Sequence, residues 1–342
     1  MRVLLTGHQG YLGTVMAPVL AAAGHEVVGL DSGLFADCVL GPAPDDPPGH
    51  TVDLRDAGPE VFAGIDAVVH LAALSNDPLG SLAPELTYDI NHHASVRLAR
   101  LAGDAGVRRF LYASTCSVYG ASGGDDLVGE DAPLRPVTPY AESKVRVEDD
   151  LSKLADDDFS PVYMRNATAF GFSPRLRADI VLNNLVGHAL LTNQVRVLSD
   201  GTPWRPLVHA LDIAEAFAQA LTAPREAVHD RAFNVGTELN NVTVAQIASH
   251  VAEAVPGSDL VITGEAGNDP RSYRVDFSRV RAALPGFHAR WTVKEGAVEL
   301  IDAYRRFGLR QGDFDRRFTR LARLSDRRGA GTVGDDLRPV AE

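Results

Sequence analysis

Residues 1–24 are typical of a strand, a glycine turn and a helix, and this order constrains the possible folds more than any other feature of the chain. An apolar run ends at Thr6, the segment Gly7-His8-Gln9-Gly10-Tyr11-Leu12-Gly13 follows, and a helix-like stretch covers residues 14–23. Glycines let the backbone turn tightly and approach a phosphate, and a helix N-terminus adds partial positive charge. The sequence therefore predicts a pyrophosphate site formed by Gly7, Gly10, Tyr11, Leu12 and Gly13.

Short apolar runs alternate with helix-like stretches up to residue 165. The runs at 26–30, 67–73, 110–114 and 162–165 are apolar along most of their length. Such runs are typical of parallel strands that helices cover on both faces. A further short strand with an acidic end is predicted over residues 51–56. The alternation predicts an α/β fold with a doubly wound parallel sheet.

Beyond residue 165 the alternation loosens, and the chain divides into two predicted parts. We expect residues 1–167 to form a dinucleotide-binding domain, to which residues 207–235 return. Residues 168–206 and 236–316 are expected to form a smaller substrate-binding lobe built from discontinuous C-terminal segments. The tail, residues 317–342, is rich in Arg, Gly and Asp and is predicted to be partly disordered.

Asp31 ends the second apolar run, about twenty residues beyond the glycine turn. A carboxylate at this place accepts hydrogen bonds from a ribose 2′-hydroxyl and repels a 2′-phosphate. The residue therefore favours NAD over NADP. The alternative is a turn residue that acts with Ser32 and Gly33. The glycine spacing differs from the usual Gly-x-Gly-x-x-Gly, so the prediction rests on mechanism and context.

Tyr140 and Lys144 form a Tyr-x-x-x-Lys pair at the start of a predicted helix, residues 140–150. Positions four apart lie on one helical face, and Pro139 suits the first turn. A phenol has a pKa near ~10, and a neighbouring ammonium lowers it by favouring the phenolate. The pair can then take a proton from an alcohol. The alternative is a surface tyrosine beside a solvated lysine.

Thr115 follows a predicted strand, in the segment Ser114-Thr115-Cys116-Ser117-Val118-Tyr119-Gly120. Its hydroxyl is expected at the carboxyl edge of the sheet, where open α/β sheets bind ligands. There it can hydrogen-bond the substrate oxygen that Tyr140 deprotonates. The alternative is a hydroxyl that caps the strand end.

Composition excludes several classes of protein. A net charge of -12 argues against a nucleic-acid binder, and no apolar run reaches the ~18 residues of a membrane span. Cys38 and Cys116 are too few for a disulfide framework, and the N-terminus lacks a signal-peptide pattern, so a cytoplasmic protein is expected. No metal site is expected at His92 and His93, because adjacent residues face different directions on a helix.

The motifs together resemble one known family over residues 1 to about 310, the extended short-chain dehydrogenases/reductases of the nucleotide-sugar epimerase and dehydratase group. The motifs that carry the resemblance are Thr6-Gly-x-x-Gly-x-x-Gly13, Asp31, His70-Leu-Ala-Ala73, Ser114-Thr115-x-x-Val-Tyr-Gly120, Pro139-Tyr140-x-x-x-Lys144 and Pro206-Leu-Val-His209-x-x-Asp212. The resemblance implies a Rossmann domain with NAD and a lobe for a nucleoside-diphosphate sugar. It also implies a homodimer joined through two helices of each subunit, here residues 90–105 and 140–154.

The resemblance also implies roles for individual residues. Tyr140 would be the general base, Lys144 would lower its pKa and hold the nicotinamide ribose, and Thr115 would orient the reacting sugar oxygen. The further cofactor contacts would be Asp53 and Leu54 at the adenine, and Leu71, Ala72 and Ala73 along the pyrophosphate and ribose. The substrate contacts would be Thr168, Asn184, Leu185, and the arginines Arg205 and Arg271 on the diphosphate.

The chain departs from the family pattern after the catalytic threonine. Dehydratases of the family place an Asp-Glu pair there, whereas this chain has Cys116 and Ser117, which disfavours a dehydratase and also a sugar-acid decarboxylase. Cys116 is interpreted as a packing residue. Thr168 stands where many members have an asparagine, which puts its substrate contact in doubt.

The sequence is best interpreted as an NAD-dependent epimerase of a nucleoside-diphosphate sugar, acting at C4 through a transient 4-keto intermediate. The alternative enzyme is an NAD(P)H-dependent 4-ketoreductase in deoxysugar biosynthesis. The alternative without catalysis is a nucleotide-sensing protein on the same fold.

Overall fold

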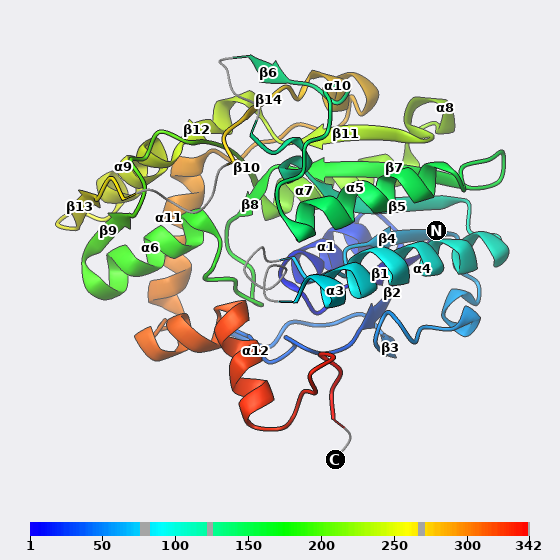
Figure 1. The fold of residues 1–342 in the computed structure, drawn as a ribbon, viewed down its shortest axis with the longest axis horizontal. Coiled ribbons are helices and arrows are strands. Elements are labelled where there is room, and N and C mark those ends of the chain that lie inside the picture. The colour runs from blue at the N-terminus through cyan, green and yellow to red at the C-terminus, as the bar shows by residue number, and fades with distance from the viewer. Residues whose placement is uncertain (76–82, 122–125, 266–270, 341–342) are drawn as a thin grey trace.

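A seven-stranded parallel sheet forms the centre of the computed structural model, which describes residues 1–75, 83–121, 126–265 and 271–340 (Figure 1). The strand order is β11-β7-β5-β4-β1-β2-β3. The chain runs outward from β1 to β3, then crosses to β4 and continues outward on the other side, so the order reverses between β1 and β4. The strands are β1 (Arg2–Thr6), β2 (Glu26–Asp31), β3 (Gly49–Thr51), β4 (Ala67–His70), β5 (Arg109–Thr115), β7 (Ser160–Asn166) and β11 (Arg231–Val235).

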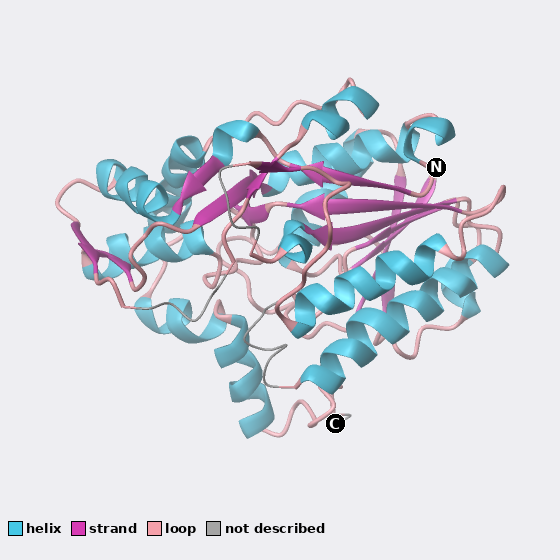
Figure 2. Ribbon diagram, turned by 45° about the horizontal axis from the view of Figure 1, so that its top comes forward, coloured by secondary structure: helices cyan, strands magenta, loops and turns pink. Residues whose placement is uncertain are grey.

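Helices cover both faces of this sheet, as Figure 2 shows. Successive residues of β1 point to opposite faces. Leu5 packs in the core that holds α1 (Tyr11–Ala22) and α7 (Ala210–Thr222). Leu4 packs in the core that holds α4 (Ala94–Asp104) and α5 (Pro139–Ser152). The prediction of a doubly wound parallel sheet is confirmed.

The helix predicted around Tyr140 forms because its first turn is well capped. The Thr138 side chain accepts a hydrogen bond from the Ala141 amide (3.2 Å), and Pro139 takes the first helical position. Both features favour helix initiation. The result is α5, which carries Tyr140 in its first turn.

A second hydrophobic core lies beside the sheet domain, toward the left in Figure 1. Residues from 168–206 and from beyond 236 both contribute to it. The helices and strands that contribute to it are β8 (Thr168–Phe170), α6 (Val181–Thr192), β9 (Gln194–Val197), β10 (Trp204–His209), β12 (Asn241–Thr243), α9 (Val244–Ala254) and α11 (Val293–Arg306), and the exposed strand β13 (Asp259–Ile262) pairs with β9.

Short elements complete the described chain. These are η1 (Pro59–Phe62), α3 (Pro84–Thr87), η2 (Tyr88–His93), η3 (Cys116–Tyr119), β6 (Leu127–Val128), α8 (Arg225–Val228), η4 (Glu238–Asn240), β14 (Arg274–Val275), α10 (Ser278–Ala283), η5 (Asp313–Arg317) and α12 (Arg320–Gly329). Within the described ranges, no helix combines the length and the apolar character needed to cross a membrane.

The strand predicted over residues 51–56 is wrong in its position. The strand β3 ends at Thr51, and a turn follows it. The Asp53 carboxylate accepts a hydrogen bond from the Arg55 amide (2.9 Å) and pairs with the Arg55 guanidinium (2.8 Å). Such bonds from an aspartate to the backbone two residues on favour a turn over a strand.

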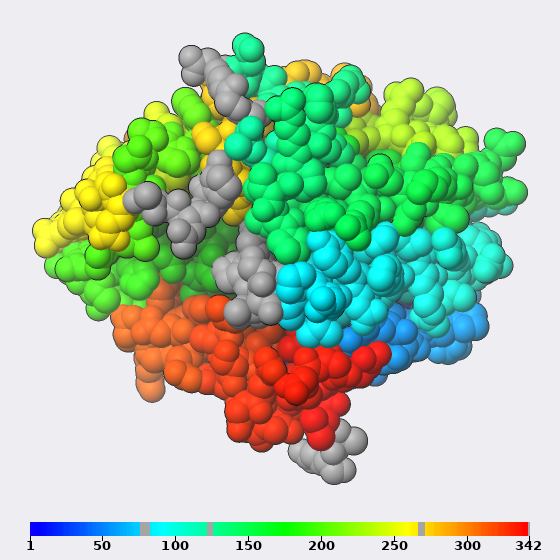
Figure 3. Space-filling model, in the orientation of Figure 1, coloured from blue at the N-terminus to red at the C-terminus, as the bar shows by residue number. Residues whose placement is uncertain are grey.

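The prediction of a partly disordered tail is wrong for residues 317–340, while residues 341–342 lie outside the described ranges. Leu324 and Leu337 are buried in a small core with Leu34 and Leu74. The segment lies against the N-terminal part of the chain in Figure 3, red beside blue. A few well-placed apolar residues and several ion pairs order a segment whose average composition is polar.

Candidate active site

The glycine turn begins one wall of a cavity of about 980 Å³. Gly7 adopts a positive φ of 75°, which favours glycine. At Gly13 an added Cβ would lie 2.1 Å from the Gly7 carbonyl oxygen, so only glycine keeps the turn this tight. The turn leads directly into α1, whose N-terminal amides are the kind of donors that bind a phosphate.

Asp31 is held at the mouth of this turn by backbone amides. Its Oδ2 accepts a hydrogen bond from Gln9 N (3.0 Å), and its Oδ1 accepts one from Gly33 N (2.9 Å). Burial raises the pKa of the Asp31 carboxyl, and these amides oppose the rise. Each carboxylate oxygen can accept a second bond, so Asp31 can also bind ribose hydroxyls.

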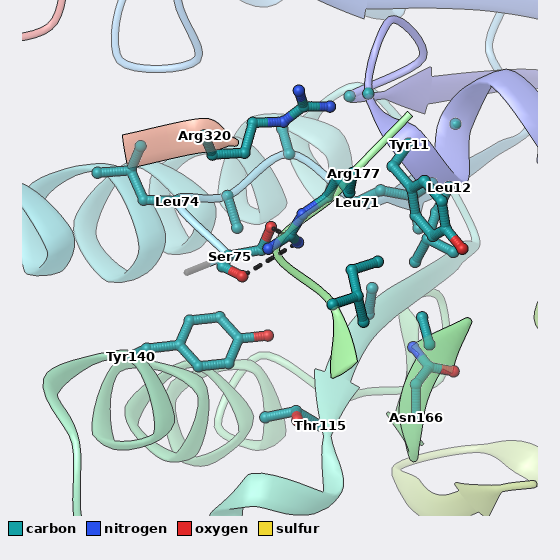
Figure 4. A pocket seen from close by; sticks show the side chains of 18 of the residues that line it. Tyr11, Leu12, Leu71, Leu74, Ser75, Thr115, Tyr140, Asn166, Arg177 and Arg320 are labelled. Atoms are coloured by element: carbon teal, nitrogen blue, oxygen red, sulfur yellow. Dashed lines mark hydrogen bonds between the residues drawn. The ribbon is translucent and has the colours of Figure 1, made fainter. Parts of the chain in front are cut away.

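Tyr140 and Lys144 lie on the opposite wall, on one face of α5. Lys144 Nζ donates to the Ala113 carbonyl in β5 (2.7 Å) and lies 5.7 Å from the centre of the Tyr140 ring. Burial lowers the pKa of Lys144 to about 7, while Glu148 acts in the opposite direction. Figure 4 shows the Tyr140 hydroxyl pointing into the cavity.

The carboxyl end of β5 carries Thr115 into the same cavity, below Tyr140 in Figure 4. Its Oγ1 accepts a hydrogen bond from Ser117 N (3.1 Å). That bond fixes the side chain and leaves its hydroxyl proton available to a ligand. The hydroxyl at the strand end therefore faces the ligand space, and it also caps the short helix η3.

A buried ion pair fixes α5 to the sheet. Glu148 lies one helical turn beyond Lys144 and pairs with Arg165 of β7, with Nη2 and Oε2 2.6 Å apart. Glu148 also accepts a hydrogen bond from Ser114 Oγ (2.5 Å). The contacts join α5 to β5 and β7, and they determine where Tyr140 sits. The sequence shows Tyr140, Lys144 and Glu148 at intervals of four residues. It did not reveal that Arg165 is the partner of Glu148.

All predicted cofactor residues line this one cavity. They are Gly7, Gly10, Tyr11, Leu12, Gly13, Asp31, Asp53, Leu54, Leu71, Ala72, Ala73, Tyr140 and Lys144. Thr115, Thr168, Asn184, Arg205 and Arg271 also line it. Leu185 does not: it points to a different side of α6 from Asn184, and its side chain is buried in the second hydrophobic core.

The two predicted substrate arginines meet although they are far apart in the sequence. The Arg205 guanidinium donates to the Arg271 carbonyl oxygen, and Arg271 Nη1 donates to Ser117 Oγ (3.1 Å). Both side chains line the cavity near the end of β5. They give this part of the cavity the positive charge that a diphosphate requires.

Several further residues of the cavity were not predicted. Arg177 pairs with Asp179 through two bonds of 3.0 Å each and donates to Ser75 Oγ (3.0 Å), as the dashed lines in Figure 4 show. Arg320 reaches the cavity from α12. In the sequence, Arg177 and Asp179 stand out only as two charged residues, two positions apart, just before α6. Arg320 lay in the segment predicted to be partly disordered.

Cys116 and the histidines have structural contacts. Cys116 Sγ donates to the Arg165 carbonyl (3.1 Å), and burial raises the pKa of this thiol, in agreement with a packing role. His70 shares hydrogen bonds with Thr6 and Ser95. His92 pairs with Asp150 (2.7 Å). Within the described ranges, no three His, Cys, Asp or Glu side chains gather as a metal ion would need.

The cavity at the reversal of strand order, with its glycine turn and its Tyr–Lys pair, is that of a Rossmann-fold enzyme that uses a dinucleotide. Residues 3–236 match the model of the NAD dependent epimerase/dehydratase family. The chain belongs to that family, and its cofactor is NAD. The open glycine turn and Asp31 fit this cofactor.

Individual proteins that are similar to this chain are consistent with its membership of the family. The UDP-glucose 4-epimerase of Mycolicibacterium smegmatis is 30% identical over 89% of this chain and 99% of its own length. The dTDP-glucose 4,6-dehydratase of Streptomyces niveus is 29% identical over 89% of this chain and 93% of its own. The structure of MoeE5 in complex with UDP-glucuronic acid and NAD has a TM-score of 0.76 at 30% identity, covering 90% of this chain and 99% of that one.

The burial of Lys144 predicts a pH-dependent stability of the nucleotide-free protein. The lysine pKa is ~10.4 in an unfolded chain and about 7 here. Between these values the unfolded chain holds the proton more often, so stability rises with pH, by up to ~1.4 kcal/mol per pH unit. From pH 7.5 to 9, urea unfolding should show this gain, of about 2 kcal/mol, in the wild type and not in Lys144→Met. Equal pH slopes for the two proteins would contradict it.

Proposed function

We propose that this protein is an NAD-dependent 4-epimerase of a nucleoside-diphosphate hexose. One observation carries the proposal: the glycine turn, the Tyr140–Lys144 pair and the arginines Arg205 and Arg271 all line the same cavity. A cofactor, a base and a diphosphate site in one space are what such a reaction needs. The UDP-glucose 4-epimerase relative, similar over nearly its whole length, supports the same activity.

In this reaction one residue of the cavity transfers a proton, and others orient the substrate and the cofactor. Tyr140 removes the proton from the C4 hydroxyl and later returns it. Thr115 donates to the same oxygen and keeps it close to Tyr140. Lys144, one helical turn from Glu148, binds ribose hydroxyls, and in its protonated form it supplies the positive charge that favours the phenolate. NAD, which the glycine turn and Asp31 would hold, would supply a reversible hydride acceptor for C4, and no cofactor would be consumed because the hydride would return to the 4-keto sugar on its other face.

The substrate side of the cavity recognises a nucleoside diphosphate. Arg205 and Arg271 bind the diphosphate oxygens, because guanidinium groups match phosphate in charge and geometry. Asn184 and Thr168 line the same cavity as these arginines, which supports the substrate contacts proposed for them. The Asn184 amide nitrogen donates to the Ala178 carbonyl (2.9 Å), which orients its oxygen as an acceptor for a sugar hydroxyl.

The contacts of the segment after Thr115 favour an epimerase over a dehydratase. Elimination of water needs an acid and a base beside the sugar. Here Cys116 is buried against Arg165, and Ser117 has a hydroxyl that does not titrate near neutral pH. The two positions therefore supply neither group.

A product assay without added cofactor tests the proposal. The purified protein is incubated with UDP-glucose, dTDP-glucose and other nucleotide hexoses, and the C4 epimer is measured by NMR. Formation of the epimer without net NADH change supports the proposal. A second incubation contains NADH and a nucleotide 4-keto sugar; consumption of one NADH per 4-keto sugar there, with no epimerisation in the first assay, would instead identify a 4-ketoreductase. NAD binding with no conversion of any sugar would identify a nucleotide sensor.

We also propose a homodimer that joins through α4 and α5 of each subunit. These two helices lie side by side on one face of the sheet (Figure 1), where a twofold axis would generate a four-helix contact. Sedimentation equilibrium should give about twice the chain mass of 36.6 kDa. A monomer mass at micromolar concentration would contradict the proposal.

A further inference from the structure

Arg320 is a buried cation whose terminal nitrogens have no hydrogen-bond partner in the described part of the chain. Its side chain begins α12, and the residue is only 5% exposed. Neither Nη1 nor Nη2 has a hydrogen-bond partner among the described residues, although the guanidinium stacks on the Phe35 ring at 4.6 Å. A buried charge without a partner costs several kcal/mol. A protein tolerates such a group most easily where a ligand completes it.

The surroundings of Arg320 leave an excess of positive charge. The side chain lines the cavity, as does Arg177, but Arg177 is already paired with Asp179. Burial lowers the pKa of Arg320 to about 10, and the charge of Arg177 contributes to this shift. The guanidinium therefore stays protonated at neutral pH. The nearby Asp37 carboxylate is engaged by Arg323 and Arg327 of the same helix.

The position of Arg320 associates it with the cofactor half of the cavity. Phe35, on which it stacks, lies four residues after the ribose-binding Asp31. The small core that anchors the tail contains Leu34 and Leu74, which flank Asp31 and Ala73 in the sequence. Figure 4 shows Arg320 reaching toward the cavity from the C-terminal segment. The substrate arginines Arg205 and Arg271 instead lie near the end of β5.

We propose that Arg320 binds the pyrophosphate of NAD, so that the C-terminal segment completes the cofactor site. The pyrophosphate is the anionic part of NAD at neutral pH, and a guanidinium binds two of its oxygens at once. Arg320 lies outside residues 3–236, which the family model matches. The segment is held in place on both sides of this contact: Arg317 donates to the Asp37 carbonyl oxygen (2.9 Å) before it, and Arg338 pairs with Asp56 (3.0 Å) after it.

The proposal rests on the NAD cofactor and not on epimerase activity, so a protein that binds NAD but converts no sugar would leave it intact. Calorimetry on nucleotide-free protein should show that Arg320→Met weakens NAD and ADP-ribose by about 10- to 100-fold. Binding of UDP-glucose should be unchanged. Arg320→Lys should lose less affinity than Arg320→Met. The matched control is Arg316→Met, which removes an exposed arginine paired with Asp326 and should leave all three affinities unchanged.

The melting temperature separates ligand binding from a structural role. Without nucleotide, Arg320→Met should melt no lower than the wild type, because it removes an unpaired buried charge. With saturating NAD, the wild type should gain more stability than the variant. Unchanged NAD affinity together with a lower melting temperature would overturn the proposal in favour of a structural role. Weaker binding of UDP-glucose alone would overturn it in favour of the substrate diphosphate.

Discussion

Replacement of Tyr140 by phenylalanine should lower the rate of nucleotide-sugar conversion by about 10²–10⁴-fold, the usual loss when a general acid or base is removed. In the proposed reaction the Tyr140 phenol takes the proton from the sugar hydroxyl, and the phenylalanine ring has no group that can do so. The affinity for NAD should change little, because the glycine turn and Asp31 on the other wall remain. Single-turnover kinetics with NAD bound, together with calorimetry, measure the two quantities separately.

The matched control is Tyr88→Phe. The Tyr88 hydroxyl donates to Glu142 Oε2 (2.7 Å) and does not line the cavity. Its loss should leave the rate within a few-fold of the wild type. If Tyr140→Phe also stays within a few-fold, Tyr140 is not the base, and the proposed reaction loses its central group.

Local patterns in the sequence were sufficient to predict the wall that holds the cofactor. The strand, the glycines and the helix follow one another within residues 1–24, so their relation is fixed by the backbone. Tyr140 and Lys144 share a helical face because they are four residues apart. The sheet could be predicted for the same reason, since apolar runs of strand length do not require knowledge of distant contacts.

Contacts between distant segments could not be predicted in this way. Arg320 reaches the cavity only because a few apolar residues of the tail, such as Leu324 and Leu337, dock on Leu34 and Leu74. Average composition does not reveal such sparse anchors. Leu185 was placed at the substrate because Asn184-Leu185 resembles a pair that contacts the sugar nucleotide in the family, but adjacent residues on a helix differ by about 100° in direction. Only the packing of α6 determines which of the two faces the ligand.

The buried pair of Glu148 and Arg165 is expected to give the largest stability effect of a single substitution. Their side chains are only 6% and 7% exposed. Glu148→Leu leaves the Arg165 charge buried without its carboxylate and should lower the free energy of unfolding by about 3–5 kcal/mol. The same change removes the acceptor of Ser114 and loosens α5. Urea unfolding, with the slope compared between variants, measures the loss.

A second pair on the same helix supplies the control. Glu142 and Arg146 also form a salt bridge, but their side chains are 42% and 45% exposed. Glu142→Leu should therefore cost no more than about 1 kcal/mol. The double substitution Glu148→Leu/Arg165→Met replaces both charges with apolar groups and should be less destabilising than Glu148→Leu alone. Arg165→Met is also measured alone. If the losses of stability in Glu148→Leu and Arg165→Met simply add in the double variant, the two side chains act independently, and another contact must hold Tyr140 in place.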